Sequence, residues 1–145
     1  MPLSQKSKSF SGLFIFKIGG QEFCLDLKEI INVVKIPDGE INFNSSDAGL
    51  EYEGDKYKII SFDKLYKLNF KSSSSARIIL TAIKKKLIGF FVDEIIEFLA
   101  LDENSTKISR VRCDGNPFIK TIIKFDQREL IMPDFERIYS VLNIN

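Results

Sequence analysis

The stretch FKIGGQEFCLDL, from Phe16 to Leu27, decides the fold class of this chain. Two short apolar segments flank Gly19 and Gly20, and polar and apolar side chains alternate in the second segment. A glycine pair between two such segments predicts a hairpin turn, because glycine readily adopts the positive φ that tight hairpin turns require. The stretch therefore predicts two antiparallel strands.

The same pattern of short apolar segments separated by turns continues to the end of the chain. Strands are predicted at 13–18, 22–27, 50–53, 57–62, 77–83, 87–92, 95–101, 119–125 and 129–132, and helices at 63–68 and 134–142. Residues 28–35 (KEIINVVK) fit either a helical turn or a strand, and residues 107–117 are assigned to a loop. Gly89 within the strand 87–92 indicates a bulge or a close approach of the backbone. The chain is expected to be mainly β.

The length of 145 residues is typical of one domain with its own core. Residues 1–10 are rich in serine and lysine and are expected to form a disordered tail. The stretch 71–75 (KSSSS) is the clearest shift in composition, and it predicts a flexible connection. We therefore expect a domain over 11–142 with halves at about 11–70 and 76–142.

Composition excludes several classes of function. The chain has no histidine, which removes the commonest general base and metal ligand. Cys24 and Cys113 are isolated and lack any CxxC spacing. A reduced thiol is expected for each, with a disulfide between them as the alternative. We expect no catalytic residue, metal, cofactor or small-molecule substrate.

Charge and hydropathy also bear on partners and compartment. The 21 basic and 20 acidic residues give a net charge of +1, whereas nucleic-acid binders usually show a basic excess. No apolar run is long enough for a signal peptide or a membrane span. We expect a cytoplasmic protein that binds neither nucleic acid nor membrane.

The chain is rich in aromatic residues, with thirteen phenylalanines and four tyrosines. Aromatic side chains could stack on nucleic-acid bases. Six phenylalanines, however, lie in apolar segments where core packing is the simpler interpretation: Phe14, Phe16, Phe23, Phe90, Phe91 and Phe125. We expect them to fill the core.

The order of these segments resembles the CheW-like family of adaptor proteins in chemotaxis-type signalling. Four pieces carry the resemblance over roughly residues 12–142: FKIGGQEFCLDL with KEIINVV, LEYEGDKYKIISFDKLYKL, LIGFFVDEIIEFL and FIKTIIKFDQRELIMPDFERI. The third piece matches a strand of glycine, two hydrophobic residues, valine and aspartate. No single piece is specific, but their order and spacing are.

The resemblance implies both a fold and a function. The implied fold is mainly β, with two small five-stranded SH3-like β-barrels packed together and a C-terminal helix. The implied function is a non-catalytic adaptor that links chemoreceptors to a CheA-type histidine kinase. Such an adaptor works through exposed apolar patches that its partners cover.

Two positions depart from the family pattern. The middle motif of the family usually reads Asn-Leu-Arg-Gly, whereas this chain has EYEG at 51–54, so Glu53 stands where the arginine would be. Asn32 stands where the family often has a charged residue. Glu53 would repel any carboxylate on a partner, which suggests a specialised partner.

Eight residues are the candidate contact residues of such an adaptor. One partner surface is predicted in the first half, at Ile30, Asn32, Val34, Glu53 and Gly54. A kinase-facing surface is predicted in the second half, at Gly89, Val92 and Asp93. Each also has a structural interpretation: core for Ile30, Val34 and Val92, a turn for Gly54, a bulge for Gly89 and a strand end for Asp93. Asn32 and Glu53 are the better candidates, because neither belongs in a core.

Three other functions remain as alternatives. A diverged CheW-like module could serve another motility or regulatory pathway. A small-barrel nucleic-acid-binding protein would bind oligonucleotides in a salt-sensitive manner. An enzyme would need two acidic side chains that converge in a pocket.

Overall fold

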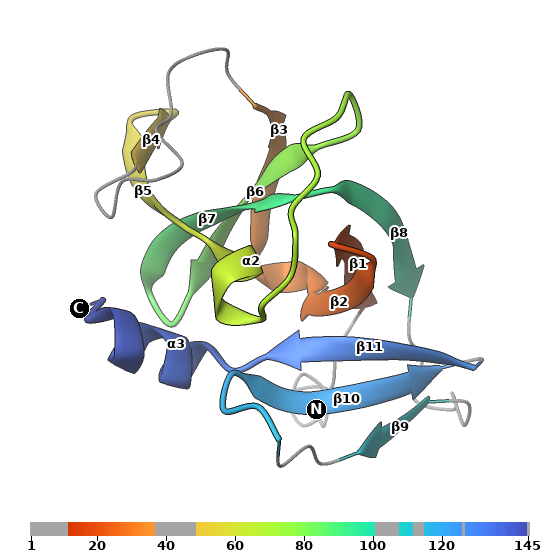
Figure 1. Ribbon diagram of the computed structural model, residues 1–145. Coiled ribbons are helices and arrows are strands. Elements are labelled where there is room, and N and C mark those ends of the chain that lie inside the picture. Colours follow the sequence, from red (N-terminus) through yellow and green to blue (C-terminus); the bar gives the residue numbers. More distant parts are fainter. Residues whose placement is uncertain (1–11, 37–48, 101–107, 112–114, 126, 145) are drawn as a thin grey trace, which may run out of the picture.

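The strands of this protein form two sheets that pack on a shared core. The computed structural model describes residues 12–36, 49–100, 108–111, 115–125 and 127–144. The six-stranded sheet has the order β8-β1-β2-β11-β10-β9 and the five-stranded sheet the order β3-β6-β7-β5-β4 (Figure 1). The mainly β fold is therefore confirmed, with six strands in one sheet and five in the other.

The strands are short, as the frequent turns in the sequence require. In the six-stranded sheet they are β1 (Gly12–Ile18), β2 (Gln21–Asp26), β8 (Glu94–Ala100), β9 (Ile108–Val111), β10 (Ile119–Phe125) and β11 (Arg128–Pro133). In the five-stranded sheet they are β3 (Ile30–Lys35), β4 (Gly49–Tyr52), β5 (Asp55–Ile60), β6 (Arg77–Ile83) and β7 (Lys86–Val92).

The predicted hairpin at the start of the chain is confirmed. β1 and β2 pair antiparallel, with Ile18 opposite Gln21. Gly19 and Gly20 between them have φ of 56° and 86°, values that side chains rarely allow. A Cβ atom on Gly19 would lie 2.9 Å from the Leu68 Cβ atom, so this turn also packs closely against the chain after α2.

Two segments that the sequence left open or misassigned are settled by the structure. Residues 28–35 contain both elements: the 3-10 helix η1 (Leu27–Glu29), capped by the Asp26 side chain, runs directly into β3. The assignment of 107–117 to a loop is wrong in part, because β9 lies within it and pairs antiparallel with β10. That pairing is with a strand further along the chain, which the local pattern of β9 does not reveal.

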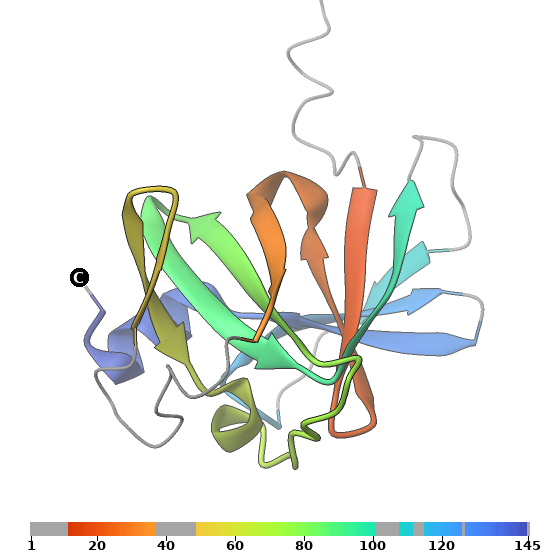
Figure 2. The ribbon, with the colours of Figure 1, turned by 90° about the horizontal axis from the view of Figure 1, so that it is seen from above.

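The sheets do not follow the expected halves of the sequence. In the six-stranded sheet, β1 and β2 come before the serine-rich stretch in the sequence, whereas β8, β9, β10 and β11 come after it. In the five-stranded sheet, β3, β4 and β5 come before that stretch, whereas β6 and β7 come after it. The chain enters the second sheet after η1, remains there to the end of β7 and then returns (Figure 2). A division near residues 71–75 therefore does not separate the two sheets.

Two helices cover the ends of the core. The helix α2 (Phe62–Leu65) is shorter than expected, and α3 (Phe135–Leu142) agrees closely with the expected terminal helix. The Asp134 side chain caps α3 by accepting a hydrogen bond from the backbone N–H of Arg137 at 3.1 Å.

Aromatic side chains dominate the shared core, as expected. The largest cluster takes residues from both sheets and both helices, including Phe16 and Phe23 from one sheet and Phe90 from the other. The Phe62 and Phe90 rings stack with their centroids 4.2 Å apart. Because this cluster belongs to both sheets, it joins them into one folding unit.

Some expectations fall on residues beyond those described. The tail at 1–10, the Phe125 side chain and Cys113 are among them. Cys24 is fully buried. The alternatives for the two cysteines therefore remain predictions.

Candidate protein-interaction surfaces

The predicted contact residues on β3 have different degrees of exposure. Ile30 and Val34 are half-buried and pack against separate core clusters. Asn32 is exposed, and its side-chain amide donates a hydrogen bond to the Tyr52 hydroxyl. Asn32 is therefore the β3 residue among these three whose polar side chain a partner can reach.

The turn between β4 and β5 is exposed and bends sharply. Glu53 and Gly54 have φ of 49° and 86°, and no atom lies within 4 Å of where a Gly54 Cβ atom would be. Glycine favours this conformation, whereas glutamate does not. Glu53 therefore places its carboxylate at the tip of a hairpin, with no ion pair among the described residues.

The structure brings the β3 candidates and the hairpin tip together. β3 and β4 are the two edges of the five-stranded sheet, so no backbone ladder joins them. The sheet nevertheless curls far enough for Asn32 on β3 to bond Tyr52, the residue next to Glu53. We call Asn32, Tyr52, Glu53 and Gly54 the seam surface.

The three candidates of the second half, Gly89, Val92 and Asp93, are buried, and they do not form a free surface. Val92 is fully buried in the shared core, because β7 is a central strand. Gly89 faces Ile59 and Leu80, whose methyl carbons would lie 2.9 and 3.1 Å from an added Cβ atom. This close approach, within a ladder of regular register, explains the glycine.

Asp93 is only 8% exposed and has backbone partners. Its carboxylate accepts hydrogen bonds from the backbone N–H of Gly19 at 2.8 Å and of Lys71 at 2.9 Å. Its own backbone N–H donates to the Lys17 carbonyl at 2.8 Å. The expectation that Asp93 faces a kinase needs an accessible side chain, and here the carboxylate is occupied within the fold.

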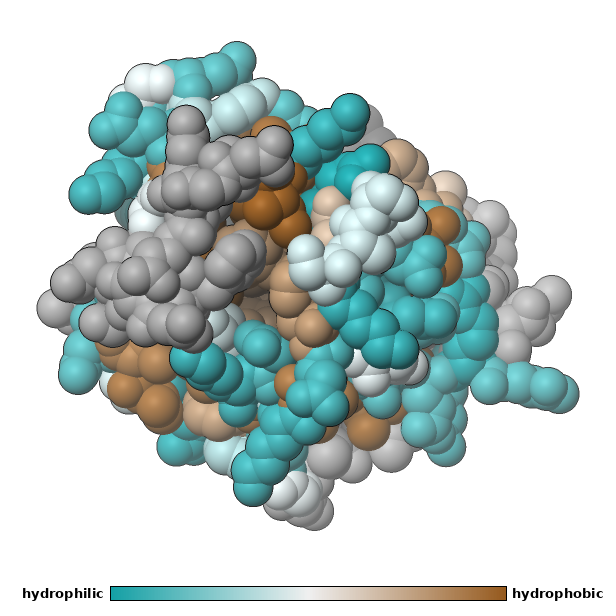
Figure 3. All heavy atoms as spheres, turned by 45° about the horizontal axis from the view of Figure 1, so that its top comes forward, coloured by the Kyte–Doolittle hydropathy of each residue, from teal (hydrophilic) through white to brown (hydrophobic). Residues whose placement is uncertain are grey.

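The structure reveals exposed apolar side chains that sequence reasoning missed. Phe98 on β8 is 64% exposed, Ile31 on β3 48% and Leu27 in η1 37%. Each lies in an apolar segment of the kind that usually fills a core, and the sequence contains no signal that sets it apart. On the face in Figure 3, hydrophobic side chains form separate small areas between hydrophilic ones.

Leu27 and Phe98 lie on the same face of the six-stranded sheet. Gly12 pairs with Ala100 and Phe14 with Phe98, and the Phe14 and Phe98 rings are 5.2 Å apart. A Cβ atom on Gly12, which would point to this same face, would lie 3.5 Å from the Leu27 side chain. We call Leu27, Phe98 and Ala100 the β8 apolar surface.

A cavity of about 360 Å³ lies between η1, the β6–β7 turn and the start of α3. Four acidic residues line it, but three have structural partners. Asp26 and Asp134 cap η1 and α3, and Glu136 pairs with Lys84 at 2.9 Å. The fourth is Glu29, whose pKa is raised, chiefly by burial and then by the nearby Asp26. Three of the four carboxylates therefore serve as helix caps or in an ion pair.

Two buried tyrosines donate to backbone carbonyls. The Tyr66 hydroxyl bonds the Phe118 carbonyl at 2.6 Å, and the Tyr139 hydroxyl bonds the Ile83 carbonyl at 2.9 Å. Burial raises the pKa of both hydroxyls. They remain protonated donors: Tyr139 ties α3 to β6, and Tyr66 ties the end of α2 to the turn before β10.

Two further features limit the choice of function. Within the described ranges, no group of three or more His, Cys, Asp or Glu side chains is placed to hold a metal ion. None of the helices seen in the structure has the length and apolar character needed to cross a membrane.

Two mixed β-sheets that share a core cluster, exposed apolar side chains and exposed polar residues at a seam define a protein-binding module of the β class. The CheW-like domain model matches residues 12–142, and the chain therefore belongs to the CheW-like family. Members of this family are non-catalytic adaptors of chemotaxis-type signalling, so the chain is not expected to be an enzyme.

The solved structures include a similar fold. The crystal structure of the scaffolding protein TtCheW from Thermoanaerobacter tengcongensis matches with a TM-score of 0.70 and 21% sequence identity. The match covers 87% of this chain and 85% of that chain. No curated protein sequence matches.

Proposed function

We propose that this protein is a cytoplasmic adaptor that couples chemoreceptors to a CheA-type histidine kinase. The observation that carries the proposal is the exposure of Phe98 within a domain of the CheW-like family. A bulky aromatic side chain in water is unfavourable, and partner contact removes that cost. Aromatic anchors often dominate the binding energy of protein interfaces.

The two surfaces offer different chemistry to a partner. The β8 apolar surface offers hydrophobic contact area around Phe98. The seam surface offers the Glu53 carboxylate and the Asn32 amide, and Ile30 and Val34 on the same strand as Asn32 are half-buried. An adaptor needs two such surfaces if it is to hold a receptor and a kinase together.

The test is a binding assay with purified partners from the same cell. The probes are a CheA-type kinase and the cytoplasmic signalling region of a chemoreceptor, each offered separately to the immobilised protein. We expect the wild type to retain both, and Phe98→Ser to weaken one of them by about tenfold or more, as loss of a central aromatic contact does.

Val141→Ser is the matched control for this assay. Val141 is 52% exposed on α3, outside both surfaces, so its loss should leave binding unchanged. Glu53→Arg tests the seam surface in the same assay, and we expect it to reduce retention of a partner. If wild-type protein retains neither kinase nor receptor, the coupling function is wrong. If Glu53→Arg leaves retention of both unchanged, Glu53 has no role.

One observation favours a second candidate, a diverged module of the same fold that serves another motility or regulatory pathway. Glu53 is exposed at the hairpin tip, where the family motif usually carries an arginine, so the charge offered to a partner is reversed. This candidate predicts that wild-type protein ignores both probes, and that Glu53→Arg gains affinity for one of them.

A further inference from the structure

The chain returns from the five-stranded sheet to the six-stranded sheet at a single residue, Asp93. β7 ends at Val92 in the five-stranded sheet and β8 begins at Glu94 in the six-stranded sheet, with no loop between them (Figures 1 and 2). The three hydrogen bonds of Asp93 connect this point to β1, to the β1–β2 turn and to Lys71. The start of β8 is thereby held in place.

β8 then contains a bulge that changes which way its side chains point. Phe16 pairs with Ile95 and Ile15 with Glu97, so Ile96 has no opposite residue. Side chains alternate between faces along a regular strand, and one extra residue reverses that alternation. Beyond the bulge, Phe98 consequently lies on the face of Phe14. A regular strand from Ile95 onward would place Glu97 on that face and Phe98 on the other.

A second anchor lies immediately beyond the bulge. The Arg128 guanidinium donates from Nη1 to the Glu97 carboxylate at 2.6 Å and from Nε to the Glu22 carboxylate at 2.9 Å. The hydrogen bonds that Arg128 donates to Glu22 and Glu97 raise its pKa, so the guanidinium stays charged. β8 is thus tied to β11 and β2 on this side.

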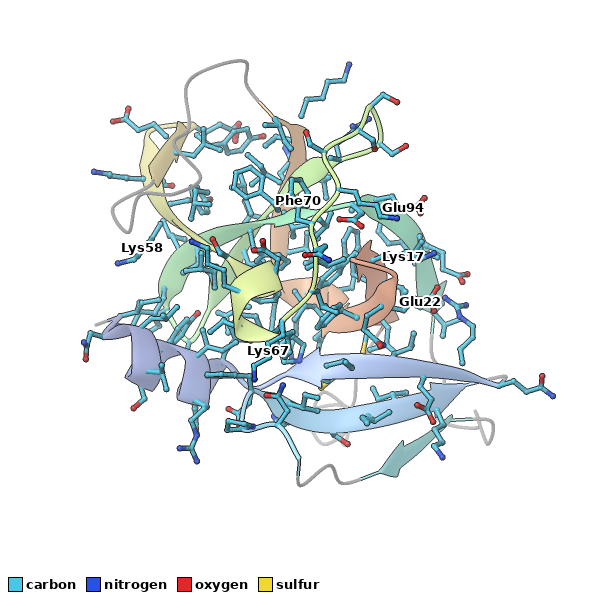
Figure 4. The ribbon with its side chains drawn as sticks, viewed as in Figure 1. Lys17, Glu22, Lys58, Lys67, Phe70 and Glu94 are labelled. Atoms are coloured by element: carbon cyan, nitrogen blue, oxygen red, sulfur yellow. The ribbon has the colours of Figure 1, made fainter. Side chains whose placement is uncertain are left out.

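The hydrogen bonds of Asp93 are the first anchor of β8, and an ion pair reinforces them on the same side of the bulge. Lys17 lies next to Glu94, with 4.0 Å between Nζ and Oε1, and Figure 4 shows both residues side by side with Glu22 close by. Charge-assisted hydrogen bonds such as those of Asp93 and Arg128 are stronger than neutral ones. The bulge therefore cannot move along β8 without breaking one of the two anchors.

We propose that Asp93 and Arg128 are positioning residues that fix the bulge at Ile96 and thereby aim Phe98 into the β8 apolar surface. Asp93 sets where β8 starts, and Arg128 holds Glu97 on the opposite face from Phe98. Which partner covers that surface depends on the proposed function. The register of β8 does not depend on it, because the register is a property of the unbound protein.

The test uses NMR spectroscopy on the full-length chain without any partner. In the wild type, the Phe14 and Phe98 rings should give strong cross-strand contacts. In Arg128→Met we expect these contacts to weaken and the amide signals of Glu94 to Ala100 to broaden or double. In Asp93→Asn we expect the same, together with exchange of the Gly19 and Lys71 amides that is faster by about tenfold, the effect of losing one charged hydrogen bond.

Lys124→Met is the matched control for Arg128→Met. Lys124 pairs with Glu129 at 3.7 Å in the same sheet and forms no ion pair with β8 among the described residues, so its loss should leave the β8 signals unchanged. Unchanged Phe14–Phe98 contacts and unchanged β8 signals in Arg128→Met would overturn the proposal. Arg128 is partly exposed, so this variant decides the matter even if Asp93→Asn does not fold.

The binding assay separates this inference from the proposed function. If the anchors aim Phe98, Arg128→Met should weaken the same partner as Phe98→Ser, and Lys124→Met should not. If the β8 signals change as expected while the wild type binds neither probe, the register proposal stands and the coupling function fails. If Arg128→Met leaves both the β8 signals and binding intact, the register proposal fails alone.

Discussion

Gly89 lies in the middle of β7, between strands β5 and β6. Ile59 on one side and Leu80 on the other fill the space that a side chain would need. Val92 and Asp93 further along the same segment are buried as well. These three residues belong to a motif that resembles a contact site, but in this structure they pack the core and join the two sheets.

At this scale we expect Gly89→Ala to destabilise the protein. The new methyl group would lie 2.9 Å from the Ile59 side chain in a closely packed core, and such overpacking costs about 1–3 kcal/mol. Urea unfolding followed by circular dichroism measures the change. Gly115→Ala is the control, because no atom lies within 4 Å of its Cβ position. Equal stability of the two variants would contradict the packing role of Gly89.

The elements of this protein differ in how far their own sequence determines them. Gly19 and Gly20 determine the turn of the β1–β2 hairpin, and α3 has an apolar stripe and a capping residue of its own. β9 has four residues, and its backbone partners lie on β10. The first two could be predicted locally, whereas β9 could not.

For α3 we expect the cap to contribute measurably to stability. Asp134→Ala removes the acceptor for the Arg137 N–H and should cost about 1 kcal/mol, the usual effect of losing an N-cap. Thermal unfolding gives the difference. Ser140→Ala, an exposed change in the same helix, is the control, and we expect little loss of stability or a small gain. A cap variant as stable as this control would show that packing alone holds α3.

The whole molecule is a single unit because each sheet needs strands from both sides of the serine-rich stretch. β3 pairs with β6, β5 with β7 and β2 with β11. The shared core also takes phenylalanines from both sheets. Neither half of the sequence contains a complete sheet or a complete core.

We therefore expect that the chain cannot be divided into two folded halves. A protease site inserted between Ser73 and Ser74 allows the comparison of cut and uncut protein. After cutting, the two fragments should remain together in gel filtration, and each fragment expressed alone should lack dispersed NMR signals, because isolated hairpins are marginal in water. A fragment that unfolds cooperatively by itself would contradict the single-unit structure.

The amino-acid sequence by itself determined the mainly β character, the first hairpin, the terminal helix and the family. It also indicated that Asn32 and Glu53 are exposed, since both are polar residues next to apolar strands. These features depend on local turn chemistry, on the spacing of apolar residues and on their order along the chain. They need no knowledge of which strands meet in space.

The tertiary structure alone decided which strands share a sheet, and which side chains are buried. Gly89, Val92 and Asp93 follow one another in a segment that resembles a contact motif, but they lie where the chain crosses between sheets. Phe98 lies in an apolar strand like many core phenylalanines, yet it is 64% exposed, on the face to which the bulge at Ile96 turns it. Burial depends on the partner strand and on the register, and both are set by residues distant in the sequence.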